Sequence, residues 1–287
     1  MSELSDKIRS EFKKADDERD ALMNTPEDIE RWDNIVYGHD DREMQRLDVY
    51  RPKQAQGEDL PIIISVHGGA WMYGDKERYQ YYCMSLAQRG FAVVNFTYRL
   101  APESKFPAQL EDVNLVCKWV MKRAGRFHFD TERIFAVGDS AGAHLLGLYA
   151  AICTNPAYAA KYDFAAIALN CGVYRIPREG ADNMTMLIMK ELLPEGGTEE
   201  ELESIDVLNG ITDVYPPVFC MTSVADHQKA QAPALVQKLM ENNVPFVYRV
   251  FGDKVNKLGH VFHCDVKTID AAQCNDAECD FFREFCF

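Results

Sequence analysis

The sequence predicts an α/β fold in which a central, mostly parallel sheet of about eight strands is flanked by helices. Continuous apolar, β-branched runs at 61–66 and 91–96 are typical of strands buried on both faces, as in a parallel sheet. Helical patterns separate such runs along the chain, which is the order expected of an α/β protein. With 287 residues and 47% hydrophobic content, the chain is long enough for one α/β domain spanning 1–287.

The individual elements follow from the spacing of apolar residues. Two strands near the N-terminus are expected at 34–38 and 46–50, joined by a polar turn. Further strands are expected at 61–66, 91–96, 133–137, 164–171, 217–222 and 246–251. Helices are expected at 79–90, 110–123, 143–152 and 230–241, and the C-terminal tail is helix-like.

Two segments are expected to lie over the C-terminal edge of the sheet. Residues 1 to about 30 have a sparse helical pattern, and Thr25-Pro26 resembles a further helix start. The segment 1–45 is therefore interpreted as a helical flap, with a solvated surface helix as the alternative. No strand pattern fits 172–212, which predicts a small helical lid. Its methionines either line an apolar acyl pocket or only attach the lid to the body.

The pentapeptide Gly138-Asp139-Ser140-Ala141-Gly142 lies between an expected strand and an expected helix. A Gly-x-Ser-x-Gly sequence in this context predicts a nucleophile elbow, a turn so tight that the serine backbone is strained. The two glycines allow close approach of neighbouring backbone. Ser140 is therefore the candidate nucleophile for attack on an acyl carbon.

A glycine pair follows the buried strand at 61–66, in the sequence His67-Gly68-Gly69-Ala70-Trp71. Acyl transfer places negative charge on a carbonyl oxygen, and each well-aimed backbone N–H stabilises this charge by roughly 3 kcal/mol. The amides of Gly68, Gly69 and Ala141 are the predicted oxyanion donors. His67 is expected to brace the loop, and an ordinary glycine turn is the alternative.

Four motifs occur in a recognisable order. These are His-Gly-Gly at 67–69, Tyr-Arg-Leu-Ala-Pro-Glu at 98–103, Phe-Pro-Ala-x-x-Glu-Asp at 106–112 and Gly-Asp-Ser-Ala-Gly at 138–142. The chain thereby resembles the hormone-sensitive-lipase-like esterases and acetylesterases of the α/β-hydrolase superfamily, and in part arylformamidase-like members. The resemblance implies scaffolding roles for Arg99, Glu103 and Asp112.

The orienting acid is predicted to be Asp226. In an α/β-hydrolase the acid lies between the serine and the histidine in chain order. Asp226 leaves the strand at 217–222, directly after the expected lid, and the resemblance implies the same residue. Asp213 precedes that strand and Asp253 lies in a later loop, so both fit less well. A helix cap is the non-catalytic alternative for Asp226.

The base is predicted to be His260, which the loop after the last expected strand delivers behind Gly259. A neutral imidazole has an ordinary pKa of ~6.5, close to working pH. His263 competes, but the resemblance implies the position of His260.

Composition excludes several other classes of protein. The formal charge of −14 disfavours nucleic acids and anionic membranes as partners. No apolar run approaches the ~20 residues that cross a bilayer, and the charged N-terminus lacks a signal-peptide core, so a cytoplasmic location is expected. The nine cysteines lack metal-type spacing and are expected to be reduced. Neither a metal nor an organic cofactor is expected.

These features predict a serine esterase that hydrolyses short-chain acyl esters, with acetyl as the expected acyl group. The substrate is expected to be a small molecule such as an acetylated sugar. An arylformamidase-like amide hydrolase and a non-catalytic small-molecule-binding homologue are the alternatives. A homodimer is compatible with the sequence, which leaves the oligomeric state undecided.

Overall fold

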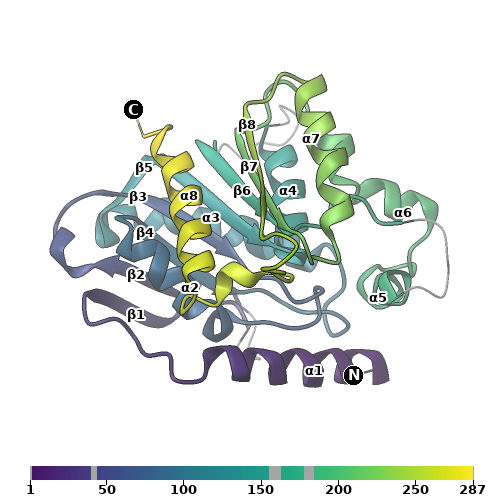
Figure 1. Ribbon diagram of the computed structural model, residues 1–287, viewed down its shortest axis with the longest axis horizontal. Coiled ribbons are helices and arrows are strands. Elements are labelled where there is room, and N and C mark those ends of the chain that lie inside the picture. The colour runs from purple at the N-terminus through teal and green to yellow at the C-terminus, as the bar shows by residue number, and fades with distance from the viewer. Residues whose placement is uncertain (1, 40–43, 155–162, 178–183, 287) are drawn as a thin grey trace.

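Eight strands form one sheet in the order β1-β2-β4-β3-β5-β6-β7-β8 in a computed structural model that describes residues 2–39, 44–154, 163–177 and 184–286 (Figure 1). The strands are β1 (Ile29–Val36), β2 (Arg46–Pro52), β3 (Leu60–Val66), β4 (Ala92–Thr97), β5 (Phe129–Asp139), β6 (Ala166–Asn170), β7 (Val218–Ser223) and β8 (Phe246–Phe251). Strand β2 is antiparallel to both β1 and β4, and all other pairs are parallel. The predicted sheet is therefore confirmed.

Helices cover both faces of the sheet (Figure 1). One apolar layer contains side chains of α2 (Lys76–Gln88) and α8 (Ile269–Arg283). The other contains side chains of α3 (Ala108–Phe127), α4 (Ala141–Thr154) and α7 (Ala232–Glu241). Strand β3 is buried along most of its length between the two layers, which explains why its sequence is apolar except for Ser65.

The N-terminal segment differs from the prediction. Helix α1 (Glu3–Asp20) ends about ten residues before the expected limit, and no helix begins at Thr25-Pro26. Instead the chain enters β1, where Ile29 is buried and lies opposite Pro52. Pairing with β2 outweighs the local helix signal, because strand formation depends on a partner that local propensity does not include. Of the expected flap at 1–45, only α1 is helical, and 40–43 lie outside the described residues.

Short helices form the segment expected to be a lid. They are α5 (Met184–Leu192), α6 (Glu199–Ser204) and the 3₁₀ turn η2 (Val207–Gly210). Residues 178–183 of this segment lie outside the described part of the chain. Figure 1 shows α1 below the sheet, and α5 beside the sheet at the end of the molecule where α1 lies. Among the described residues, we find no helix that combines the length and the apolar character needed to cross a membrane.

Candidate active site

Ser140 lies at the tight turn between β5 and α4. Its φ of 55° is in the left-handed region, which a residue with a side chain enters only at a cost. The Ser140 amide donates to the Asn170 carbonyl at 2.9 Å, so the end of β6 holds the strained residue in place. A Cβ at Gly142 would lie 2.0 Å from the Val66 carbonyl oxygen, so the elbow packs directly against the end of β3. This arrangement presents Ser140 at the C-terminal edge of the sheet.

A cavity of about 410 Å³ opens in front of Ser140. Helix α1 contributes Phe12, Ala15, Asp16 and Arg19 to its wall, and the segment after β6 contributes Val173, Met184, Thr185 and Ile188. The cavity therefore has a largely apolar wall from the segment after β6 and a mixed wall from α1. Met184 lines the cavity whereas Met189 is buried in the core, so these two methionines of α5 have different environments.

The loop after β3 lines the same cavity, but its amides are not equivalent. The N–H of Gly68 donates to the Tyr79 hydroxyl at 3.0 Å, so this predicted oxyanion donor is already engaged. Within the described part of the chain, no acceptor is found for the amides of Gly69, Ala70 and Ala141. The prediction placed Gly68 in the donor set because a sequence does not show where a neighbouring helix places a hydroxyl.

His67 is fully buried beneath this loop. Its Nδ1 lies 2.7 Å from the Gly68 carbonyl, which can only accept, so Nδ1 carries the proton. The ring stacks on Tyr98, whose hydroxyl donates to the His67 carbonyl at 2.9 Å. Burial lowers the pKa of His67 to about 4. A neutral, fully packed imidazole at this position holds the shape of the loop.

His260 and Asp226 form a hydrogen-bonded pair at the edge of the cavity. His260 Nδ1 lies 2.7 Å from Asp226 Oδ1. The carboxylate also accepts from the Thr222 hydroxyl at 2.7 Å and from the Gln228 amide at 2.9 Å. Burial opposes ionisation, but the hydrogen bond and charge of His260, together with the hydrogen bonds from Gln228 and Thr222, outweigh it and lower the pKa of Asp226 to about 2. Asp226 is thus ionised at neutral pH, and His260 Nε2 is left without the ring proton.

The two alternative candidates for the orienting acid lie elsewhere. Asp213 lines a different cavity, and Asp253 accepts from the amides of Val255 and Asn256. Asp226 is not the cap of α7, because Gln231 occupies that position.

His263 has a partner of its own behind the serine. It is fully buried, and its Nε2 lies 2.8 Å from Oδ1 of Asp139, the residue before Ser140. Burial works against a charge on His263, but Cys264 and Asp139 raise its pKa well above the ordinary value. Sequence analysis missed this pair, whose only local signal was a carboxylate inside the elbow and a second histidine near the base.

The residues assigned scaffolding roles make the expected kind of contact. Arg99 donates to both carboxylate oxygens of Asp112, with Nη2 2.8 Å from Oδ1. Glu103 accepts two hydrogen bonds from Arg9 of α1, at 2.9 and 2.6 Å. Arg9 also donates to the Met72 and Ala101 carbonyls. These contacts attach α1 to the loops around the cavity.

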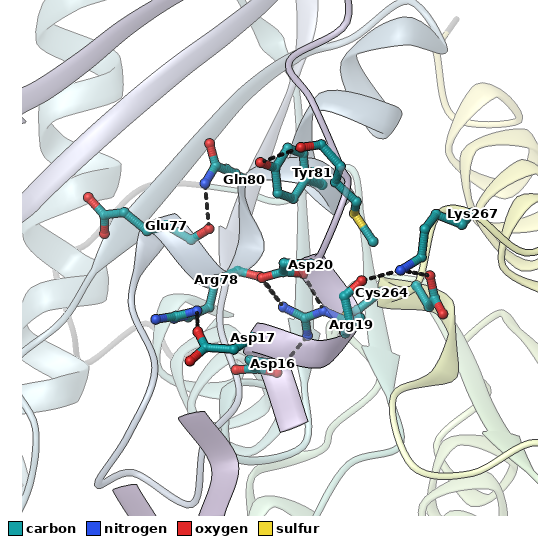
Figure 2. Close-up of polar contacts among 12 residues, drawn as sticks. Asp16, Asp17, Arg19, Asp20, Glu77, Arg78, Gln80, Tyr81, Cys264 and Lys267 are labelled. Carbon is teal, nitrogen blue, oxygen red and sulfur yellow. Dashed lines mark hydrogen bonds and ion pairs between the residues drawn. The ribbon is translucent and has the colours of Figure 1, made fainter. Parts of the chain in front are cut away.

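The other end of α1 is attached by a second polar cluster (Figure 2). Arg19 pairs with Asp16 at 2.9 Å and donates to the Arg78 carbonyl at 2.6 Å. The Arg78 guanidinium donates in turn to Asp17, and Lys267 donates to the Arg19 carbonyl. Helix α1 is therefore fixed over the cavity at both ends, largely by charged groups.

Among the residues that the structure describes, two groups of side chains have the composition of metal ligands: Asp139, His263 and Cys264, and Cys171, Asp226 and His260. In each group the imidazole and the carboxylate already satisfy one another through a short hydrogen bond. All nine cysteines are free thiols, and eight of them are buried.

A family model described as BD-FAE matches residues 47–245. This chain belongs to the BD-FAE family. Among curated proteins, the BD-FAE chain is 33% identical to "Esterase LipC" of Mycobacterium tuberculosis over 128 residues, covering 44% of this chain and 31% of that protein. It is 33% identical to "Esterase LipQ" of the same organism over 163 residues, covering 54% and 38%. The chain thus spans about a third of the length of these relatives.

Solved structures agree on the fold. Inhibited esterase B from Lactobacillus rhamnosis superposes with a TM-score of 0.89 at 24% identity, covering 99% of this chain and 97% of that one. The Pyrobaculum calidifontis esterase gives a TM-score of 0.81 at 21% identity, covering 99% and 93%. The chain therefore has the α/β-hydrolase fold, and the expected resemblance to the esterase group of that superfamily is confirmed.

Proposed function

We propose that this chain is a carboxylic ester hydrolase whose nucleophile, base and acid are Ser140, His260 and Asp226. The observation that carries the proposal is their arrangement: the strained serine and the Asp226-oriented imidazole line one cavity. The relatives named as esterases, and one named "Ethyl acetate hydrolase" from Pseudomonas putida, support the same chemistry.

The first step is attack by Ser140 on the ester carbonyl. The ionised Asp226 accepts a hydrogen bond from Nδ1–H of His260 and thereby fixes the tautomer in which Nε2 is the free base. His260 takes the hydroxyl proton of Ser140 as the Oγ–carbon bond forms. The resulting imidazolium is stabilised by Asp226, which stays ionised because its pKa is about 2.

Negative charge collects on the carbonyl oxygen as Ser140 attacks. The amides of Gly69, Ala70 and Ala141 are the groups we assign to that oxygen, since each belongs to a residue that lines the cavity and none has an acceptor among the described residues. Donors held by a rigid loop need no reorganisation during the reaction, and each contributes roughly 3 kcal/mol. This set keeps two of the three residues predicted from sequence and replaces Gly68 with Ala70.

The intermediate then collapses. His260 returns its proton to the leaving alkoxide, which departs as the alcohol and leaves the acyl group on Ser140. Water enters, His260 removes its proton, and a second tetrahedral intermediate releases the carboxylic acid and regenerates Ser140. Every proton in this cycle passes through His260 Nε2.

We propose a short acyl group, with acetyl preferred, and a polar alcohol such as a sugar. A cavity of about 410 Å³ falls within the usual ~300–1,000 Å³ range of small-molecule sites. Val173, Met184 and Ile188 offer an apolar surface, whereas Asp16, Thr185 and Gln228 offer polar groups. Rates on p-nitrophenyl esters of increasing acyl length test this preference, which is wrong if the long esters react faster.

The test of the reaction itself is Ser140→Ala assayed on p-nitrophenyl acetate, together with labelling by a fluorophosphonate. We expect the variant to lose hydrolysis and labelling while retaining its thermal unfolding midpoint. Full activity in the variant would exclude Ser140 as the nucleophile. A wild-type chain that neither labels nor hydrolyses esters would instead be a binding homologue. Preference for N-formylkynurenine over acetyl esters would indicate an amide hydrolase.

A further inference from the structure

The Tyr79 hydroxyl lies in the candidate active site with an unused donor. Tyr79 belongs to α2, is only 5% exposed, and lines the cavity together with Ser140. Its oxygen accepts the Gly68 N–H at 3.0 Å. The hydroxyl proton has no acceptor within the described residues. Because a buried donor without an acceptor is unfavourable, a ligand atom or water is expected at this proton.

The hydroxyl is close to the reacting serine. A Cβ built on Gly68 would lie 2.9 Å from the Tyr79 hydroxyl oxygen and 3.3 Å from Ser140 Cβ. Tyr79 and Ser140 therefore flank the same point of the loop. Gly69 and Ala70, whose amides we assign to the oxyanion, follow immediately in the chain.

Neighbouring tyrosines differ from Tyr79 because each has an acceptor inside the protein. Tyr82 donates to Glu278 at 2.8 Å, Tyr98 to the His67 carbonyl at 2.9 Å, and Tyr73 to Asp16 at 2.9 Å. Tyr81, on the same helix, donates to the Met23 carbonyl at 3.1 Å. Tyr73 lines the same cavity and still has an internal acceptor, so the free donor distinguishes Tyr79 from these four tyrosines.

We propose that the Tyr79 hydroxyl donates a hydrogen bond to the anionic oxygen of the tetrahedral intermediate, as a side-chain donor beside the loop amides. This oxygen becomes a strong acceptor only when Ser140 has attacked. The contact therefore favours the transition state over the bound ester, which is the requirement for accelerating the reaction. Ser140 itself forms no hydrogen bond with Tyr79 in the free protein, so the donor is available when the charge appears.

The environment keeps the hydroxyl in its donating form. Burial and the nearby Asp139 raise the pKa of Tyr79 well above its ordinary value. The Tyr79 oxygen accepts the Gly68 N–H, so its own proton is left for donation. No bond to Tyr79 forms or breaks, so this residue only supplies a hydrogen bond and the proton stays on its oxygen.

This inference rests on the proposed ester hydrolysis, and the experiment separates the two. Tyr79→Phe is compared with wild type and with Tyr81→Phe as the matched control, since Tyr81 bonds away from the cavity. We expect Tyr79→Phe to lower kcat by about 100-fold, the effect of losing one oxyanion donor, with KM changed less than threefold. Affinity for a trifluoromethyl ketone, which forms a stable oxyanion adduct, should fall by the same factor. Tyr81→Phe should match wild type.

If Tyr79 only supports the loop by accepting the Gly68 N–H, a different experimental result is expected. With 3,5-difluorotyrosine at position 79, ionisation of the phenol removes the donor but strengthens the acceptor. Donation predicts that kcat falls in step with the phenolate absorbance, whereas bracing predicts that activity persists. Persisting activity, or a Tyr79→Phe kcat within threefold of wild type, overturns the inference. Absence of ester hydrolysis and fluorophosphonate labelling in wild type would instead refute the proposed function.

Discussion

Replacement of Gly142 by alanine tests how closely the elbow and the oxyanion loop are fitted together. An alanine Cβ at this position would lie 2.0 Å from the Val66 carbonyl oxygen and 2.6 Å from the His67 carbonyl oxygen. Real Cβ contacts are essentially never shorter than 3.0 Å, and both neighbours are backbone atoms that no rotamer change can move. The elbow and the end of β3 must therefore separate by about 1 Å.

This separation acts directly on the geometry of the reaction. Gly142 is two residues after Ser140, and His67 immediately precedes the loop that carries the proposed oxyanion donors. A 1 Å misplacement of reacting groups costs about 10²-fold in rate, and overpacking costs about 1–3 kcal/mol of stability. We expect Gly142→Ala to lose at least about 100-fold in kcat/KM on p-nitrophenyl acetate and about 1–3 kcal/mol in urea unfolding.

Gly125→Ala is the matched control, because a Cβ at Gly125 in α3 meets nothing within 4 Å. Alanine in a helix is favoured over glycine by about 0.5–1 kcal/mol, so this variant should be slightly more stable and fully active. Gly142→Ala with wild-type kcat/KM would show that the elbow can move without consequence, and the reasoning from close approach would be refuted.

Three further substitutions test the Asp226–His260 pair, the buried His144 and the attachment of α1. Asp226→Asn should lower kcat by about 10⁴-fold in ester hydrolysis, because His260 loses the carboxylate that fixes its tautomer. His144→Gln should make the free energy of urea unfolding less sensitive to acid. Burial lowers the pKa of His144 to about 4, so between that pH and ~6.5 the native chain binds fewer protons than the unfolded chain. The wild-type free energy of unfolding therefore decreases by about 3 kcal/mol as the pH falls through this window. In Arg9→Met, the fold increase in KM should exceed the fold decrease in kcat by a factor of roughly 10, because the lost hydrogen bonds to Glu103 position α1 over the cavity.

Each of these expectations has an outcome that contradicts it. Unchanged kcat in Asp226→Asn would mean that another group orients His260. Parallel pH curves for wild type and His144→Gln would mean that His144 does not titrate between the folded and unfolded states. For Arg9, the matched control is Lys7→Met, which removes an exposed ion pair on the same helix, with Lys7 61% exposed. Equal KM values in these two variants would show that Arg9 does not position α1.

Much of the sheet could be predicted because its signals are local. The runs at 61–66 and 91–96 are apolar except for Ser65 and Asn95, and in the structure β3 and β4 have apolar layers on both faces. Ser140 could be identified in the same way, since strand, Gly-x-Ser-x-Gly and helix are contiguous in the chain. The prediction of Asp226 and His260 also required the order of the elements along the chain. In the structure, His260 Nδ1 lies 2.7 Å from Asp226 Oδ1.

The N-terminal 45 residues were less predictable. The charged, helix-like stretch to residue 30 contains both α1 and the start of β1, and its own spacing does not separate them. Pairing of Ile29 with Pro52 settles the boundary, and Pro52 lies outside the window over which a helical period is read.

The sequence by itself predicted the fold class, the candidate nucleophile and the order of the candidate acid and base, because periodicity and turn chemistry are properties of neighbouring residues. The tertiary structure alone decided which amides are free, since Tyr79 of α2 engages Gly68 in the loop after β3. It also paired His263 with Asp139 across 124 positions and placed α1 over the cavity. Such contacts form when the packing of layers brings together segments that are distant in the chain. The spacing of neighbouring residues does not indicate which distant segments will meet.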